Sequence, residues 1–200
     1  MVTLTGNNYQ DAHDALAYEV WMLIRTGQLV SVQKGIIYGA MLESFLIHTR
    51  NLYDFLYGWE YRVPPKQENI VEKTPCENLK MAKRNKNDGE DDIGAEMFFD
   101  DGKQQNKWKD ERNKYKPSYI RKNYVHINKG LAHLTLSRIN GDQHIEWKYE
   151  QINKELLEPI QVFQRLVDDK RKGKRWIGYF HINEKLVDLD NLIDKTLKTI

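Results

Sequence analysis

Two stretches of the sequence carry the residues whose types and spacing could do chemistry. One covers residues 127–138 and the other residues 48–55, and each sets histidine, amide and charge into an apolar helical pattern. A histidine near an arginine can act as general acid or base toward a phosphodiester while the guanidinium stabilises the developing charge. The candidate catalytic residues are therefore His133, Arg50, Asn128, Asn51 and His48.

These side chains take different roles if their two helices lie side by side. His133 is then the acid or base, Arg50 stabilises charge, and Asn51 and Asn128 orient the reacting groups. At 100° per residue, His48 and Asn51 fall on the buried side of their helix, whereas Arg50 lies four residues before Asp54 and can pair with it. The alternative is that the buried imidazole and amide only join two helices, because leaving either unsatisfied costs roughly 1–3 kcal/mol.

A basic run near the C-terminus is a candidate for binding a phosphate backbone. Residues 170–175 hold five basic side chains in six positions, and a tryptophan that could stack on a base follows. The alternative is that these cations complement the dipole at a helix C-terminus. The candidate binding residues, including two in the 127–138 stretch, are Lys129, Arg138, Lys172, Lys174, Arg175 and Trp176.

Metal and cofactor sites are not predicted. His126 and His133 are seven residues apart, which separates them by roughly 10 Å along a helix, too far for one metal ion. A single cysteine, Cys76, excludes a multi-cysteine zinc site. Phosphate-binding loops, dinucleotide fingerprints, nucleophile elbows and paired-carboxylate motifs are absent from the sequence.

Length, net charge and the lack of long apolar runs limit the number of domains and the kinds of partner that the sequence predicts. Two hundred residues fit one domain, 1–200, and 31 basic against 29 acidic residues leave a net charge of +2 that favours no particular partner. The sequence begins without the pattern of a signal peptide and has no long apolar run, so we expect a soluble, cytoplasmic protein with no membrane partner.

Apolar residues recur at helical spacing in most of the chain, and no series of alternating strands is seen. The pattern predicts an all-α, up-and-down bundle of four to five main helices. We expect Gly27 to end the first helix, Ser31 to cap the second, residues 174–182 to be irregular or briefly extended, and Asn183 to cap the last helix. The helices are expected at residues 8–26, 31–57, 117–140, 148–172 and from 183 onward.

Residues 60–116 are predicted to form a charged, poorly patterned insertion between the second and third long helices. Residues 88–101 carry seven acidic and no basic side chains, and residues 103–116 carry six basic and two acidic. The apolar island at 93–99 is expected to form a short helix that anchors the insertion to the core. Either a variable surface loop or a lid over a substrate fits this composition.

The stretch Asn128 to His133 resembles the Arg-Asn-x-x-Ala-His stretch of the HEPN (higher eukaryote and prokaryote nucleotide-binding) helical domains. Residues 43–51 taken with 128–135 also resemble a family of uncharacterised bacterial helical proteins. The resemblance covers roughly residues 35–57 and 117–165. It implies a four- to five-helix bundle, a metal-independent ribonuclease of toxin or defence type, and a possible homodimer. Asn128 stands where the superfamily has its catalytic arginine, and Arg50 could replace that arginine from the facing helix.

These observations lead to one functional hypothesis and one alternative. The first is a HEPN-like bacterial domain that binds or cleaves RNA or a nucleotide. The alternative is a non-enzymatic helical scaffold or protein-interaction domain whose polar cluster is purely structural.

Overall fold

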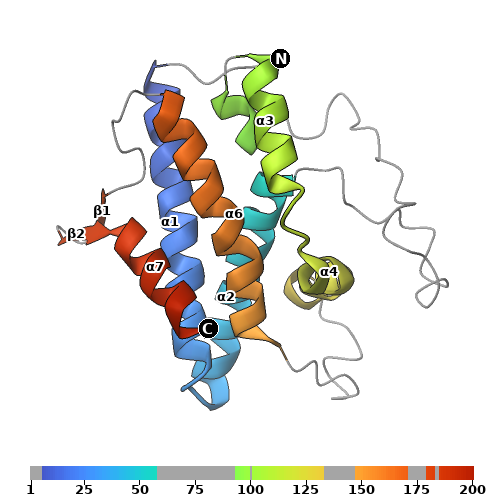
Figure 1. The fold of residues 1–200 in the computed structure, drawn as a ribbon. Coiled ribbons are helices and arrows are strands. Elements are labelled where there is room, and N and C mark those ends of the chain that lie inside the picture. The colour runs from blue at the N-terminus through green and yellow to red at the C-terminus, as the bar shows by residue number, and fades with distance from the viewer. Residues whose placement is uncertain (1–5, 58–92, 100, 133–146, 171–178, 183–184) are drawn as a thin grey trace.

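The protein is an all-α helical bundle with one small β-hairpin among the described residues (Figure 1). The computed structural model describes residues 6–57, 93–99, 101–132, 147–170, 179–182 and 185–200. Its elements are α1 (Gly6–Val30), α2 (Gly35–Tyr57), the 3-10 helix η4 (Ala95–Phe98), α3 (Gly102–Arg112), α4 (Ser118–Ala132), α6 (Tyr149–Lys170), β1 (Tyr179–Ile182), β2 (Lys185–Asp188) and α7 (Leu189–Thr199).

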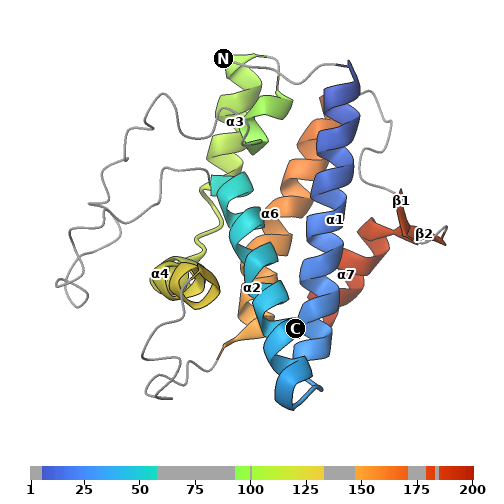
Figure 2. The same cartoon turned by 180° about the vertical axis from the view of Figure 1, so that it is seen from behind.

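Three long helices form the body of the bundle. Figures 1 and 2 show α1, α2 and α6 extending in a common direction, with α2 and α6 running opposite to α1. Helix α4 is seen nearly end-on in both views, so it crosses the others, and it packs against α2 and α6. Helix α7 packs on α1 and α6, while α3 packs on α6. No helix in the described part of the chain is long and apolar enough to cross a membrane.

The first predicted helix, residues 8–26, is confirmed as α1. The apolar residues whose helical spacing predicted it are all buried: Tyr9, Ala12, Leu16, Val20 and Leu23. The corresponding apolar residues of the second predicted helix are only partly buried. Leu52 and Phe55 lie in the core, but Ile37 and Ala40 near the start of α2 are exposed. The beginning of α2 therefore stands outside the packed layer.

The boundary between the first two helices differs from the prediction. Helix α1 continues through Gly27 to Val30, and a Cβ at position 27 would lie 3.0 Å from Phe45 Cε2 and 3.2 Å from Asn153 Nδ2. Gly27 is thus where α2 and α6 approach α1 closely, not a helix stop. Ser31, which was expected to cap α2, lies just after the last residue of α1, and its Oγ donates to the carbonyl of Gln28 in the last turn of α1. Helix α2 begins at Gly35, which has a positive φ of 63°.

Residues 93–112 contain more structure than the pattern predicted. The expected short helix at the apolar island is confirmed as η4, with Phe98 buried. Helix α3 was not predicted, because the side chains that it buries are Gln105, Trp108 and Arg112, two of which are polar. Residues 58–92 of the predicted insertion lie outside the described residues.

A buried arginine fastens this segment to the bundle. Arg112 of α3 donates through Nη1 to the carbonyl of Leu56 at 3.0 Å and to Glu96 Oε1 at 3.1 Å. Its guanidinium also lies 5.6 Å from the centre of the Tyr57 ring. Because Leu56 belongs to the last turn of α2, Arg112 satisfies a carbonyl that the helix itself leaves open.

Helix α4 begins at Ser118, close to the predicted start of the third helix. Its first turn is capped from another helix, since Glu155 of α6 accepts from the backbone N–H groups of Tyr119 at 2.9 Å and Ile120 at 3.0 Å. A carboxylate is favourable at this position because it satisfies open donors and complements the helix dipole. The predicted continuation from 133 to 140 lies outside the described residues.

The predicted start of the last helix at Asn183 is wrong. Strands β1 and β2 pair antiparallel, with Tyr179 opposite Asp188, and α7 follows at Leu189. Asp188 is the N-cap, since its side chain accepts from the N–H of Asn191 at 2.9 Å. Leu186, expected in the helix, belongs to β2.

Candidate functional site

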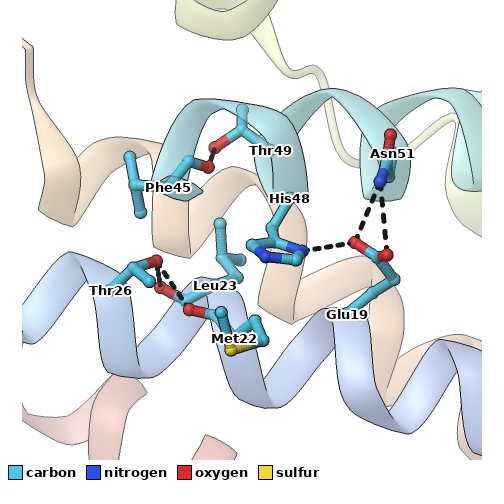
Figure 3. A network of polar contacts seen from close by, with 8 residues as sticks. All are labelled: Glu19, Met22, Leu23, Thr26, Phe45, His48, Thr49 and Asn51. Atoms are coloured by element: carbon cyan, nitrogen blue, oxygen red, sulfur yellow. Dashed lines mark hydrogen bonds and ion pairs between the residues drawn. The ribbon is translucent and has the colours of Figure 1, made fainter. Parts of the chain in front are cut away.

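A polar cluster joins α1 to α2 near the middle of both helices (Figure 3). The Nδ1 atom of His48 lies 2.6 Å from Glu19 Oε2, and Asn51 Nδ2 donates to both carboxylate oxygens of Glu19 at 3.2 Å. One carboxylate from α1 thus holds an imidazole and an amide from α2. We call these three residues the Glu19 cluster.

The positions of the three side chains follow from helical geometry. His48 and Asn51 are three residues apart, so both face the same side of α2, toward α1. Glu19 follows Leu16 by three residues and therefore borders the buried stripe of α1. His48 is 7% exposed, and the ring of Tyr18 meets it edge-on at 5.7 Å between centres. His48 is consequently shielded from solvent, whereas Glu19 and Asn51 are partly exposed.

The Glu19 carboxylate determines which ring nitrogen of His48 carries a proton. An ionised carboxylate can only accept hydrogen bonds, so His48 Nδ1 must carry the proton. In the neutral ring this leaves Nε2 as an acceptor, the form that a general base or a ligand requires. The same contact also ties α1 to α2. The contact between Glu19 and His48 therefore fits two roles: it can orient His48 as a general base, and it can link α1 to α2.

Neighbouring hydroxyl groups do not extend the cluster. Thr49 Oγ1 donates to the carbonyl of Phe45 at 2.8 Å, and Thr26 Oγ1 donates to that of Met22 at 2.6 Å (Figure 3). Both hydroxyls are satisfied within their own helices. The polar groups available for chemistry at this place are those of the Glu19 cluster itself.

Arg50 is adjacent to Asn51 in the sequence but does not join the cluster. Its side chain is partly exposed, and no hydrogen bond or ion pair connects it to another residue in the described part of the chain. The expected pair with Asp54 does not form, because Asp54 accepts instead from Tyr124 Oη at 2.6 Å. Tyr124 takes the place expected for Arg50 because α4 packs against this part of α2 and brings the Tyr124 phenol to the Asp54 carboxylate.

The two helices that carry the predicted catalytic residues do pack together. Besides the hydrogen bond to Asp54, the Tyr124 ring lies 5.1 Å from that of Tyr53, between centres. However, His48 and Asn51 bind α1, which the sequence analysis had not assigned to the site. The structure thus divides the polar residues of α2 between two neighbouring helices.

The other predicted site residues lie outside the part of the chain whose side chains the structure describes. Asn128 and Lys129 belong to α4, whose side chains are described only as far as Ile127. Outside the described residues lie His133, Arg138, Lys172, Lys174, Arg175 and Trp176. The predicted convergence of His133 with Arg50 therefore stays a prediction.

Glu19 is the functional candidate that sequence reasoning missed. A signal for it does exist, because Glu19 stands between Leu16 and Leu23 at helical spacing, where an apolar residue is expected. A carboxylate at such a position must find a partner once the helix packs. That partner could not be named from the sequence, since nothing local to α1 indicates which side chain faces it.

A pair of tyrosines marks another polar contact, at the end of the bundle where α6 begins. Tyr38 Oη of α2 and Tyr149 Oη of α6 are 3.1 Å apart. Burial, followed by the hydrogen bond with Tyr38, raises the pKa of Tyr149 well above its ordinary value. Tyr149 thus keeps its phenol proton under ordinary conditions.

Among the described residues, no group of three or more His, Cys, Asp or Glu side chains could hold a metal ion.

Comparisons with known proteins identify no family for this chain. The chain matches no protein-family model, and comparisons with curated proteins and with solved structures found no match.

Proposed function

We propose that the chain is a HEPN-like helical domain that binds or cleaves RNA or a nucleotide. The resemblance of residues 128–133 to the HEPN motif is the sequence basis of this proposal. In it, His133 is the acid or base, Arg50 stabilises phosphate charge, and Asn128 orients the substrate. Catalysis of this kind needs no metal ion, because the guanidinium provides the positive charge.

The contact between α2 and α4 is the observation that supports this proposal best. Tyr124 and Asp54 are joined at 2.6 Å. Asn128 follows Tyr124 by about one helical turn, and Arg50 precedes Asp54 by about one turn. Both residues therefore belong to helical segments that adjoin this contact. Arg50 is suited to an anionic ligand, since no described carboxylate neutralises it.

The test uses Arg50→Gln, because the partly exposed side chain can be changed without opening the core. We expect wild-type protein to bind or cleave short single-stranded RNA, and Arg50→Gln to lower binding or cleavage by at least about tenfold. Arg165→Gln removes the same charge from an exposed site on α6 and is the matched control. Equal effects of the two variants, or no activity of the wild type on RNA, would remove the proposal.

A second candidate function has its own supporting observation. Glu19 binds both His48 and Asn51, and His48 is 7% exposed, as expected for a link that fixes how α1 and α2 pack. In this case the chain is a non-enzymatic scaffold or protein-interaction domain. His133→Ala separates the two candidates: it abolishes cleavage of RNA in the first and changes nothing in the second.

A further inference from the structure

The connection between α1 and α2 exposes four large aliphatic side chains. Leu29 is 41% exposed, Val32 68%, Ile36 92% and Ile37 57%. We call these four residues the hairpin tip. In both views of the molecule, this end of α1 and α2 projects beyond the ends of α6 and α7 (Figures 1 and 2). The hairpin tip is thus a protruding apolar surface.

None of the described helices covers this surface. Helix α6 begins at Tyr149, which meets Tyr38 of α2, so Ile36 and Ile37 lie before the level at which α6 starts. Each aliphatic side chain left in water forgoes roughly 25 cal/mol for every Å² that burial would remove. Single exposed apolar residues are normal, but four at one end of a helical hairpin indicate a binding surface.

The charged side chains within the hairpin segment itself are all of one sign. Between Glu19 and Glu43 the sequence contains no acidic residue and two basic ones, Arg25 and Lys34, both exposed. The first turn of α2 also lacks a carboxylate, although one there would stabilise the helix. An apolar tip whose own segment carries only positive charges is complementary to an apolar layer with an anionic border.

We propose that the hairpin tip docks on the surface of an anionic lipid bilayer. Ile36 and Ile37 enter the boundary between headgroups and acyl chains, and Lys34 lies among the lipid phosphates. This departs from the sequence prediction of no membrane partner, which rested on the lack of a spanning run. Surface docking needs no spanning helix.

The shape of the hairpin tip favours a bilayer over a protein. A stable protein interface takes about 800 Å² and 20–30 residues from each partner. Four side chains at the convex end of a hairpin provide much less than that. A fluid bilayer can instead close around a protruding tip. RNA is also disfavoured as the occupant, because aliphatic side chains offer neither hydrogen bonds nor stacking.

The test is cosedimentation of the full chain with phosphatidylcholine vesicles, with and without phosphatidylglycerol. We expect binding to the phosphatidylglycerol vesicles. The double variant Ile36→Ser/Ile37→Ser should weaken it at least about tenfold, since burial of two side chains is lost. Lys34→Gln should weaken binding to the anionic vesicles selectively. RNA binding should not change in the double variant, which separates this inference from the proposed function.

The matched control is Ile47→Ser/Ile93→Ser, which removes two isoleucines that are each 39% exposed elsewhere on the molecule. It should bind vesicles as the wild type does. The inference fails if the wild type does not bind vesicles, or if the Ile36/Ile37 double variant binds as tightly as the control. It fails equally if light scattering finds a dimer that the double variant dissociates, because a second copy of the chain would then cover the hairpin tip.

Discussion

Glu19 is the single side chain on which the polar cluster depends. Its carboxylate accepts from both His48 and Asn51, so its loss leaves two donors without their acceptor. Hydrogen bonds to an ionised group contribute more than neutral ones, about 1.5–3 kcal/mol each. The effect of removing Glu19 therefore measures how much the cluster stabilises the fold.

We expect Glu19→Ala to lower the free energy of unfolding by about 2–3 kcal/mol, measured by urea denaturation. Asp11→Ala is the control, since Asp11 is an exposed carboxylate on the same helix and should change stability by less than about 0.5 kcal/mol. Similar values for the two variants would mean that the cluster does not hold α1 to α2.

Tyr149 provides a pH-dependent test at the same scale. Burial and the hydrogen bond with Tyr38 raise the pKa of Tyr149, so the folded protein holds the phenol proton more tightly than the unfolded chain does. Its contribution to stability is complete below the phenol's ordinary pKa of about 10 and is lost as the pH rises above it.

Tyr149→Phe should therefore make the loss of stability in alkali shallower. The measurement is the urea midpoint of the wild type and the variant on both sides of the phenol's ordinary pKa. Tyr18→Phe, which removes a hydroxyl from a ring that is 44% exposed, is the control and should leave the slope unchanged. Parallel pH curves for Tyr149→Phe and the wild type would contradict the prediction.

At the scale of elements, α4 depends on a cap that comes from another helix. Glu155 of α6 accepts from the N–H groups of Tyr119 and Ile120, which begin α4. Loss of a helix cap costs about 0.5–2 kcal/mol. Because this cap also joins two elements, it sets where α4 lies relative to α6 as well as where it begins.

Glu155→Ala should lower the free energy of unfolding by about 1–2 kcal/mol and speed amide hydrogen exchange in the first turns of α4. Glu158→Ala removes a partly exposed carboxylate from the middle of the same helix and is the control. Faster exchange spread evenly over all helices, instead of concentrated in α4, would show that Glu155 acts on overall stability and not as a cap.

Two glycines test how closely the helices approach. A Cβ at Gly27 meets Phe45 and Asn153 at 3.0 and 3.2 Å, whereas one at Gly39 of α2 meets nothing within 4 Å. Gly27→Val should destabilise by about 1–3 kcal/mol through overpacking. Gly39→Ala should stabilise by about 0.5–1 kcal/mol, since alanine is the better helix former. Thermal unfolding of both variants is the measurement, and a stable Gly27→Val would contradict the close approach.

At the scale of the whole molecule, Arg112 connects parts of the chain that are far apart in sequence. It joins α3 to the end of α2 and to Glu96 of η4, so it attaches residues 93–112 to the bundle. The aromatic rings of this segment pack on the core, with Phe98 and Trp108 each 5.4 Å from Phe163 of α6, between ring centres. The segment is therefore part of the core.

Arg112→Met should destabilise the protein by about 3 kcal/mol, because it removes one partner of a shielded ion pair and opens a carbonyl of α2. Lys107→Met, at an exposed position of the same helix, is the control. The measurement is chemical denaturation followed by tryptophan fluorescence, to which the buried Trp108 contributes. A loss no larger than that of Lys107→Met would mean that the ring contacts alone hold α3.

The sequence by itself determined the long helices and the class of the fold. Period-3.6 apolar stripes in residues 8–26 and 148–172 are local signals, and they are read correctly because each stripe has to be buried whatever it packs on. Helix α3 was not predicted because two of the side chains that it buries are polar. Gln105 donates to the carbonyl of Phe99, and Arg112 donates to Glu96 and to the carbonyl of Leu56, which is 56 residues away. Strand β1 lies within the residues expected to be irregular or briefly extended, but β2 was missed because the pattern of residues 183–188 also suits a helix.

Only the tertiary structure decided which polar side chains meet. His48 and Asn51 were identified from their place on a buried helix face, but their partner Glu19 lies 29 and 32 residues away. Arg50 and Asp54 have the spacing of an ion pair, yet Tyr124 from α4 takes the carboxylate. The physical reason is that spacing along one helix determines the face on which a side chain lies, whereas its partner is determined by which helix packs against that face.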